Sequence, residues 1–265
     1  MNYVSVSGTK WTLSAVGRRY FGPQAVESYE AFVEYAVHQW KFIENLDEVL
    51  RTGKGIDFHA HQTSADWSAY QRGMLESAKG FAWFVAKHTP VPEGASSCLD
   101  LAGSHGYVGG LLCQKHPPMR STVLDRPEAL ATARTLGQGE PWFSMVSFRE
   151  GNLLTDDLGK GYDVVLSANI LHHFPAEANR GILRRVRAAM KPGGIVSIFE
   201  IEPPHEGQAA DAGGDGFALY FRITSDSSCF RGADYVSWLS AAGFASPRVI
   251  RSWKMPSRML VVAKA

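Results

Sequence analysis

Cysteine is scarce in this chain, which argues against a small fold held together by disulfides. Its 265 residues include three cysteines, Cys98, Cys113 and Cys229. Their number is odd and no two of them form a C-x-x-C pair, so disulfide and metal frameworks are not indicated. We therefore expect a protein of a reducing compartment, the cytoplasm.

Long hydrophobic runs and an excess of charge of one sign are also missing. No stretch approaches the roughly 20 apolar residues of a membrane span, and the first residues lack the apolar core of a signal peptide. The 27 basic and 26 acidic residues leave a formal charge of +1. Without a basic cluster there is no electrostatic footprint for nucleic acid. We therefore expect neither a membrane nor a nucleic acid as partner.

The two parts of the chain differ in their periodicity. In the first part apolar residues recur at helical spacing, for example Tyr70, Met74 and Ala78. We predict helices there over residues 28–45, 43–51 and 65–87. A segment rich in proline, glycine and serine follows at residues 89–97, which is typical of a linker. We therefore predict two domains, a mainly helical one over 1–92 and a second over 93–265.

The second part alternates between strands and helices. This alternation predicts an α/β fold of Rossmann-like type, a parallel sheet with helices on both faces. The last two strands are separated only by residues 252–258, too few for a crossover helix, so they should pair antiparallel. The seven predicted strands are 97–102, 121–125, 143–148, 162–168, 194–201, 246–251 and 258–264, and the helices are 106–116, 127–136, 176–190, 213–224 and 232–242.

A short apolar run in the first predicted strand of this part ends at Asp100, and a turn with Gly103 and Gly106 follows. Such a strand-turn-helix unit forms nucleotide sites at the carboxyl edge of a sheet. Ser104 stands where the second glycine of G-x-G-x-x-G would be. Repulsion between this carboxylate and a phosphate about 4 Å away would cost roughly 4 kcal/mol. The same carboxylate attracts a cation. The loop therefore predicts a cationic ligand such as S-adenosylmethionine.

Two polar residues follow the next two strands. Asp125 comes 19 residues after Gly106, the spacing at which an acid accepts hydrogen bonds from ribose hydroxyls. The alternative is an acid that caps the helix starting at Pro127. The amide of Asn152 would lie beside an adenine ring and accept from its amine. The alternative is an ordinary asparagine turn.

Two histidines, His172 and His173, follow the fourth strand, and Glu200 lies near the end of the fifth. Neighbouring strands lie about 4.8 Å apart, so Glu200 and His172 can pair as a base and the acid that orients it. The alternatives are a packed or solvated histidine and an exposed edge glutamate. We favour His172 over His173 as the base. His59 and His61 are at most half of a metal site, so we expect no metal.

Together these segments resemble the small-molecule O-methyltransferases, a family that includes plant caffeate and isoflavone enzymes and bacterial antibiotic-tailoring enzymes. Residues 99–106 (Leu-Asp-Leu-Ala-Gly-Ser-His-Gly) resemble the family's cofactor loop, and 123–128 (Val-Leu-Asp-Arg-Pro-Glu) its second-strand acid. Residues 170–177 (Ile-Leu-His-His-Phe-Pro-Ala-Glu) resemble the segment with its catalytic histidine. Upstream, residues 11–17 look like the end of the family's winged-helix wing.

The resemblance implies a seven-stranded class I methyltransferase fold and methyl transfer from S-adenosylmethionine to a hydroxyl of a small, aromatic or polyketide-like acceptor. It implies that His172 is the general base and Glu200 its orienting acid, and that Tyr70 and Met74 lie between donor and acceptor. The residues implied at the S-adenosylmethionine site are Asp100, Ala102, Gly103, Asp125, Arg126, Asn152, Leu153 and Ala168.

Several positions depart from the family's pattern. Ala102 and Ser104 stand where glycines are usual, His173 replaces an aspartate, and no glutamate occurs near Cys229. These departures leave two alternatives open. One is an enzyme of the same fold that uses the donor for decarboxylation, hydroxylation or cyclisation; the other is a catalytically silent donor-binding partner subunit. The aromatic surface of the N-terminal region predicts a homodimer.

Overall fold

In the computed structural model of the chain, residues 2–23, 25, 27–57, 62–204, 212–225 and 227–265 are described. A seven-stranded sheet has the order β5-β4-β3-β6-β7-β9-β8. β9 pairs antiparallel with β7 and with β8, and the other pairs are parallel. The predicted α/β fold and its antiparallel final pair are confirmed. The strands are β3 (Ser97–Leu101), β4 (Arg120–Asp125), β5 (Val146–Glu150), β6 (Tyr162–Ala168), β7 (Met190–Ile201), β8 (Ala245–Ser252) and β9 (Met255–Lys264).

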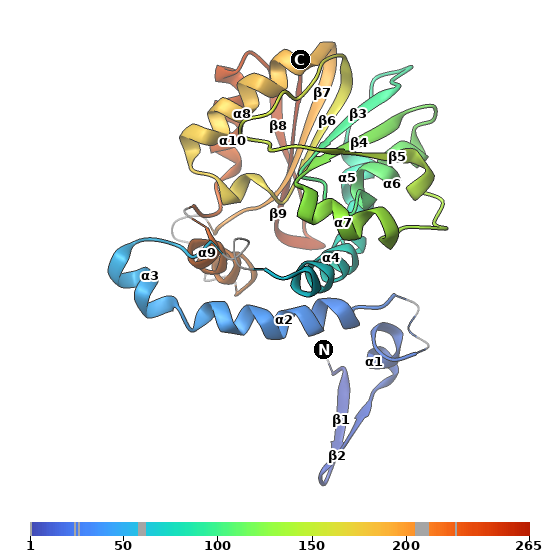
Figure 1. The fold of residues 1–265 in the computed structure, drawn as a ribbon, viewed down its shortest axis with the longest axis vertical. Coiled ribbons are helices and arrows are strands. Elements are labelled where there is room, and N and C mark those ends of the chain that lie inside the picture. Colours follow the sequence, from blue (N-terminus) through green and yellow to red (C-terminus); the bar gives the residue numbers. More distant parts are fainter. Residues whose placement is uncertain (1, 24, 26, 58–61, 205–211, 226) are drawn as a thin grey trace.

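Helices cover both faces of this sheet, because successive strand residues point to opposite sides. On one face Leu99 and Leu101 pack with α8 (Ala176–Ala189) and α10 (Gly232–Ala241). On the other, Cys98 packs with α5 (Ala82–His88) and α6 (Tyr107–Lys115), and Val123 packs with α7 (Pro127–Leu136). Figure 1 shows the two helical layers on either side of the strands. The sheet is therefore buried on both faces, as a parallel sheet requires.

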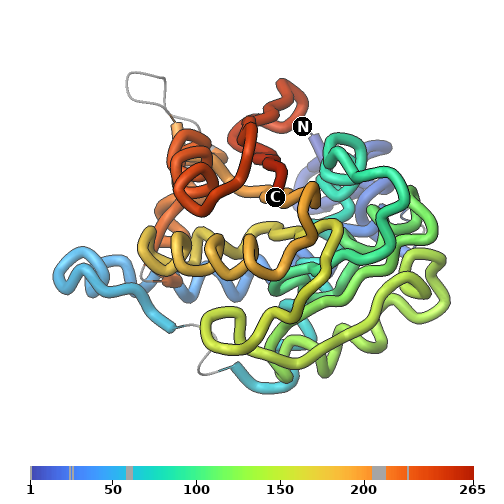
Figure 2. The backbone as a smooth tube through the Cα atoms, turned by 90° about the horizontal axis from the view of Figure 1, so that it is seen from above, coloured from blue at the N-terminus to red at the C-terminus, as the bar shows by residue number. Residues whose placement is uncertain are grey.

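The N-terminal region lies along one end of the sheet. It comprises the hairpin β1 (Val4–Ser7) and β2 (Lys10–Leu13), then α1 (Ala15–Tyr20), α2 (Glu30–Ile43), α3 (Leu46–Thr52) and α4 (Ser64–Lys79). α4 and α9 (Ala212–Thr224) lie between the strands and α2 (Figure 1). α3, light blue in Figure 2, projects at the side of the molecule. This arrangement places α4 and α9 over the end of the sheet where β3, β4 and β6 finish.

Several predicted elements have different limits in the structure; β7, for example, begins at Met190 rather than at residue 194, and β9 at Met255 rather than at residue 258. The single helix predicted over 65–87 is wrong, because α4 ends at Lys79 and α5 begins at Ala82. Gly80 separates them, a residue with low helix propensity. The strand predicted from residue 143 begins at Val146, since residues 143–145 form a 3-10 turn. α5, which we assigned to the N-terminal domain, packs on the sheet beside α6.

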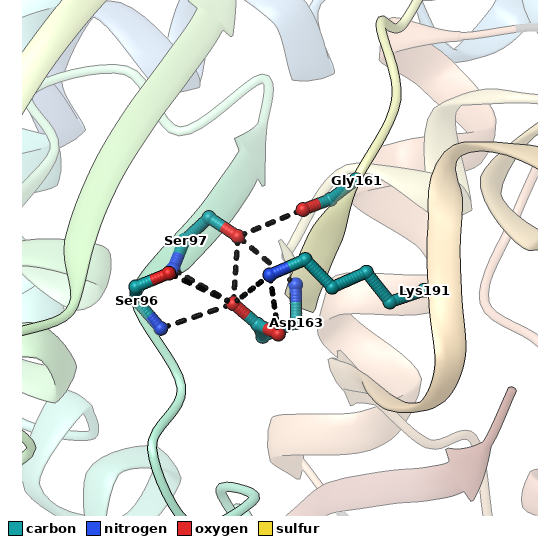
Figure 3. A network of polar contacts seen from close by, with 5 residues as sticks. All are labelled: Ser96, Ser97, Gly161, Asp163 and Lys191. Carbon is teal, nitrogen blue, oxygen red and sulfur yellow. Dashed lines mark hydrogen bonds and ion pairs between the residues drawn. The ribbon is translucent and has the colours of Figure 1, made fainter.

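A polar cluster joins the amino-terminal ends of β3, β6 and β7. Asp163 accepts hydrogen bonds from the backbone amides of Ser96 and Ser97, at 3.0 and 3.1 Å, and from the Ser97 hydroxyl at 2.8 Å. Lys191 donates to both carboxylate oxygens at 2.8 Å (Figure 3). Burial alone would raise the pKa of Asp163, but these bonds hold it well below its usual range. This cluster lies at the end of β6 away from Ala168.

None of the helices in the described residues is long and apolar enough to span a membrane.

Candidate active site

A cavity of about 600 Å³ lies between α4 and the carboxyl ends of β3, β4 and β6. In open parallel sheets ligands bind at this edge, where the strand order reverses. Here the reversal falls between β3 and β6, because β4 and β5 extend the sheet in one direction and β6 and β7 in the other. Ten residues singled out from the sequence line this cavity: Tyr70, Met74, Asp100, Ala102, Gly103, Asp125, Arg126, Asn152, Leu153 and Ala168.

Asp100 lies beneath the loop that follows β3, with no exposed surface. One carboxylate oxygen accepts a hydrogen bond from the Gly109 amide at 3.2 Å. A Cβ on Gly103 would come within 2.4 Å of the carboxyl carbon, so only glycine allows this close approach. Burial raises the pKa of Asp100 to about 7. The sequence predicted a charged carboxylate at the mouth of the loop, whereas this buried carboxyl gains most of its charge only near neutral pH.

The loop itself adopts a conformation that normally favours glycine. Ala102 and Ser104 have φ values of 49° and 56°, in the left-handed region. Hydrogen bonds compensate for this cost: Ala102 N–H donates to Leu124 O and Ser104 N–H to Asp125 Oδ2, both at 2.8 Å. The Ser104 hydroxyl donates to the side-chain oxygen of Gln71 on α4. The two departures from the family's glycines thus keep the glycine-like backbone.

Asp125, at the end of β4, lines the cavity beside this loop. Its second carboxylate oxygen accepts from Arg126 N–H at 2.8 Å. Burial raises its pKa to about 6. The helix-capping alternative is not observed, because the N-cap residue of α7 is Arg126 and no side chain caps that helix. Each carboxylate oxygen retains a lone pair for a further donor.

Asn152 lines the same cavity, but its amide oxygen already accepts from Leu154 N–H at 2.9 Å. This bond makes the asparagine turn that the sequence left open as the alternative. The oxygen keeps one lone pair for a ligand.

His172 and Glu200 form a buried pair. His172 Nδ1 lies 2.6 Å from Glu200 Oε2, and the side chains are 1% and 0% exposed. The other carboxylate oxygen accepts from the backbone amides of Ile170 and Leu171 at 2.9 and 2.7 Å. Three interactions thus fix the carboxylate, and the carboxylate fixes the imidazole. The predicted pairing across neighbouring strand ends is confirmed.

The two histidines differ in their relation to the cavity. His173 is among the lining residues, whereas His172 and Glu200 are not. Phe221 on α9 stacks on His172, with ring centroids 3.6 Å apart and planes at 25°. His172 is therefore buried under an aromatic ring, and neither of the two rings is among the residues that line the cavity.

Sequence reasoning missed two amides on the cavity wall, Gln71 and Asn169. Both lie beside residues that were singled out, Gln71 after Tyr70 and Asn169 before the histidine turn. Their side chains carried no periodic or spacing signal, so only the tertiary structure identifies them. His59 and His61 lie outside the described residues. Among the residues described, no group of three or more His, Cys, Asp or Glu side chains is placed to hold a metal ion.

The arrangement has the parts needed to bind an adenosine-type ligand and to move a proton. Asp100 and Asp125 line the cavity, and the carboxylate of Glu200 selects the tautomer in which His172 Nδ1 carries the hydrogen. The opposite nitrogen, Nε2, then has the lone pair that a general base requires.

Comparisons with known proteins point to one family. The tetracenomycin polyketide synthesis 8-O-methyl transferase of Streptomyces glaucescens is 31% identical over 58% of this chain and 45% of its own length. The 3-amino-4-hydroxybenzoate 4-O-methyltransferase of Streptomyces cremeus is 30% identical over 63% of this chain and 47% of its own. The chain thus spans about half the length of these curated relatives.

Solved structures share the fold at low sequence identity. An O-methyltransferase family protein from Burkholderia thailandensis superposes with a TM-score of 0.83 at 23% identity, over 99% of this chain and 79% of that one. Human N-acetylserotonin methyltransferase, solved with S-adenosylmethionine, has a TM-score of 0.84 at 18% identity, over 98% and 78%. Residues 42–245 match the O-methyltransferase domain family over more than half of the chain. The chain therefore belongs to the O-methyltransferase domain family.

Proposed function

We propose that this protein binds S-adenosylmethionine and transfers its methyl group to a hydroxyl of a small aromatic or polyketide-like acceptor. Family membership supports the reaction class, and the activities named for the Streptomyces relatives support the acceptor class. The cavity wall supports it as well, since Tyr70, Met74 and Phe81 offer apolar surface for a flat acceptor.

The residues of the cavity fit the donor. Asp125 has free lone pairs for two ribose hydroxyls, and Asp100 Oδ1 is a buried acceptor without a partner among the described residues. Two acids suit a ligand with an ammonium and a sulfonium. When bound, S-adenosylmethionine supplies an electrophilic methyl group on positively charged sulfur. Ala102, Gly103, Arg126, Asn152, Leu153 and Ala168 would complete the donor site.

The observation that carries the mechanism is the 2.6 Å contact between His172 Nδ1 and Glu200 Oε2. With Nδ1–H held by the carboxylate, Nε2 accepts the proton of the acceptor hydroxyl. A phenol with a pKa of about 10 is largely protonated at pH 7, a deficit of roughly 4 kcal/mol. A positioned base contributes about 10²–10⁴-fold, which offsets most of that deficit. Methyl transfer in this proposal requires the buried His172 to become accessible from the cavity.

The burial of His172 also favours a second candidate. Its side chain is 1% exposed and does not line the cavity; if it stays buried, His172 has no route to an acceptor, and the pair serves only to hold the turn after β6. The protein would then use the donor for another reaction, such as decarboxylation, hydroxylation or cyclisation, or act as a silent donor-binding subunit.

An assay on the purified chain separates these candidates. The protein is incubated with S-adenosylmethionine and a panel of phenols and hydroxylated polyketides. Mass spectrometry follows the product formed from the donor and the product formed from the acceptor. O-methylation predicts stoichiometric methyl ether and S-adenosylhomocysteine. A changed acceptor without a methyl group indicates another donor-dependent reaction, and tight donor binding without turnover indicates a silent subunit.

We further infer that the protein works as a homodimer inside the cell. Apolar side chains at Val33, Val37 and Trp40 form an exposed stripe along α2, and a stripe of this kind usually marks an interface. Cys98, Cys113 and Cys229 are all unpaired, which fits a reducing compartment.

A further inference from the structure

Three buried polar atoms on the cavity wall have no hydrogen-bond partner among the described residues. They are Gln71 Nε2, Asp100 Oδ1 and Asn169 Oδ1. Buried polar groups are nearly always paired, so an unpaired set around a cavity indicates the polar groups of its ligand. One of the three atoms is a donor and two are acceptors. Such a wall suits a ligand that carries both an anionic and a cationic group.

Gln71 is held in a fixed orientation. The side chain is 0% exposed, and its oxygen accepts from the Ser104 hydroxyl. Ser104 N–H in turn donates to Asp125 Oδ2 at 2.8 Å. The chain of bonds ties α4 to the loop after β3 and leaves the Gln71 amide nitrogen as the group still able to donate.

Asn169 directly follows the last residue of β6. Its φ is 55°, a conformation that asparagine tolerates better than most residues. Its backbone N–H donates to Phe199 O at 2.8 Å, which fixes it on the neighbouring strand β7. The side-chain oxygen is thereby placed at the edge of the sheet as an acceptor without a partner.

The strand order indicates which part of the donor reaches these two amides. Asn152 follows β5 and Asp125 ends β4, so the adenosine lies on that side of the reversal in strand order. The rest of the donor then extends across the loop after β3, toward β6. Gln71 is hydrogen-bonded to that loop through Ser104. Asn169 directly follows β6, on the opposite side of the reversal from Asp125.

We propose that Gln71 and Asn169 bind the α-amino-acid end of the donor. Gln71 Nε2 donates to its carboxylate, and Asn169 Oδ1 accepts from its ammonium group. This inference rests on the proposed donor binding. It predicts that the two amides respond in opposite ways to an added negative charge, because one faces an anion and the other a cation.

Calorimetry with two ligands tests the inference. S-adenosylhomocysteine has the amino-acid end, and 5′-methylthioadenosine has the same adenosine and thioether without it. Gln71→Glu keeps an acceptor for the Ser104 hydroxyl but replaces the donor with a carboxylate. We expect it to weaken S-adenosylhomocysteine at least about 10-fold and to leave 5′-methylthioadenosine within about 2-fold.

The Asn169 variants supply the opposite response. Asn169→Asp keeps the acceptor and adds charge, so S-adenosylhomocysteine binding should stay equal or tighten. Asn169→Gly removes the acceptor and permits the same φ, so binding should weaken about 10-fold. Gln138→Leu, at an exposed position after α7, is the control and should change neither ligand. Unchanged 5′-methylthioadenosine binding also shows that each variant is folded.

The outcomes separate this inference from the proposed function. If Gln71→Glu and Asn169→Gly weaken both ligands equally, or neither, the assignment of the amino-acid end is wrong while donor binding stands. If Gln71→Glu and Asn169→Asp change affinity in the same direction, the assignment is also wrong. If the unaltered protein binds neither ligand, donor binding itself fails, and the inference fails with it.

Discussion

Asp125 at the end of β4 makes donor affinity depend on pH. Burial raises its pKa to about 6, and the ribose hydroxyls hydrogen-bond better to the ionised carboxylate. Affinity for S-adenosylmethionine should therefore fall as the pH drops below about 6, approaching 10-fold per pH unit. Calorimetry between pH 5 and 8 measures it. Asp125→Asn should remove the loss of affinity below about pH 6 and leave any loss near pH 7 that comes from Asp100, whose pKa is about 7. An unchanged profile in that variant would exclude Asp125 as the source of the loss.

His172 and His173 give a second prediction at the residue scale. Replacing His172 with Ala should lower turnover on a phenol by about 10²-fold or more with little change in donor affinity. His173→Ala should mainly alter donor binding or stability, because His173 lines the cavity whereas His172 is the histidine that pairs with Glu200. Single-turnover rates and donor affinities are measured for both. The reverse pattern would assign the base to His173.

At the scale of elements, Asp163 joins the amino-terminal ends of three strands (Figure 3). Its pKa lies below the value near 3.9 of an unfolded chain. Its contribution to stability is therefore present above about pH 4 and is lost as the pH falls further. Asp163→Ala should lower the free energy of unfolding by about 1–3 kcal/mol. Lys191→Met should cost less, under about 1 kcal/mol, because the lysine is 44% exposed and screened.

Urea unfolding at pH 7 and pH 3 measures this contribution, and donor affinity serves as the control. The cluster lies at the opposite end of β6 from the cavity, so affinity should not change. A variant that loses donor binding while its stability is unchanged would contradict a purely structural role.

At the scale of the whole molecule, the exposed stripe of α2 determines the oligomeric state that we propose. Val37 and Trp40 are 63% and 68% exposed, and Leu50 on α3 is 71% exposed. Figure 1 shows α2 along the outer edge, with the β1–β2 hairpin projecting beyond it. Light scattering at micromolar concentration should give twice the mass of one chain. The double variant Val37→Glu, Trp40→Glu should give the mass of one chain, with unchanged donor affinity. If the unaltered protein also has the mass of one chain, the dimer is refuted.

The sequence by itself determined the α/β sheet, its antiparallel final pair and the edge of the sheet at which the cavity opens. Periodicity of apolar residues distinguishes helices from strands, and the strand-turn-helix unit at residues 97–115 fixes one edge of the sheet. The 28-residue separation of His172 and Glu200 spans one helix and returns to the neighbouring strand, so their contact followed from local spacing. The break between α4 and α5 at Gly80 did not follow from the sequence, because one glycine in a periodic segment does not always end a helix.

Only the tertiary structure decided which groups face the cavity. Asp100 is fully buried because Gly103 and Gly109 allow its carboxyl to lie beneath the loop, and burial, a property of the packed fold, sets its pKa. Phe221 covers His172 from a helix 49 residues further along the chain. Gln71 meets Ser104 across 33 residues. Contacts between such distant segments depend on how α4 and α9 pack over the strand ends, and no local pattern specifies that packing.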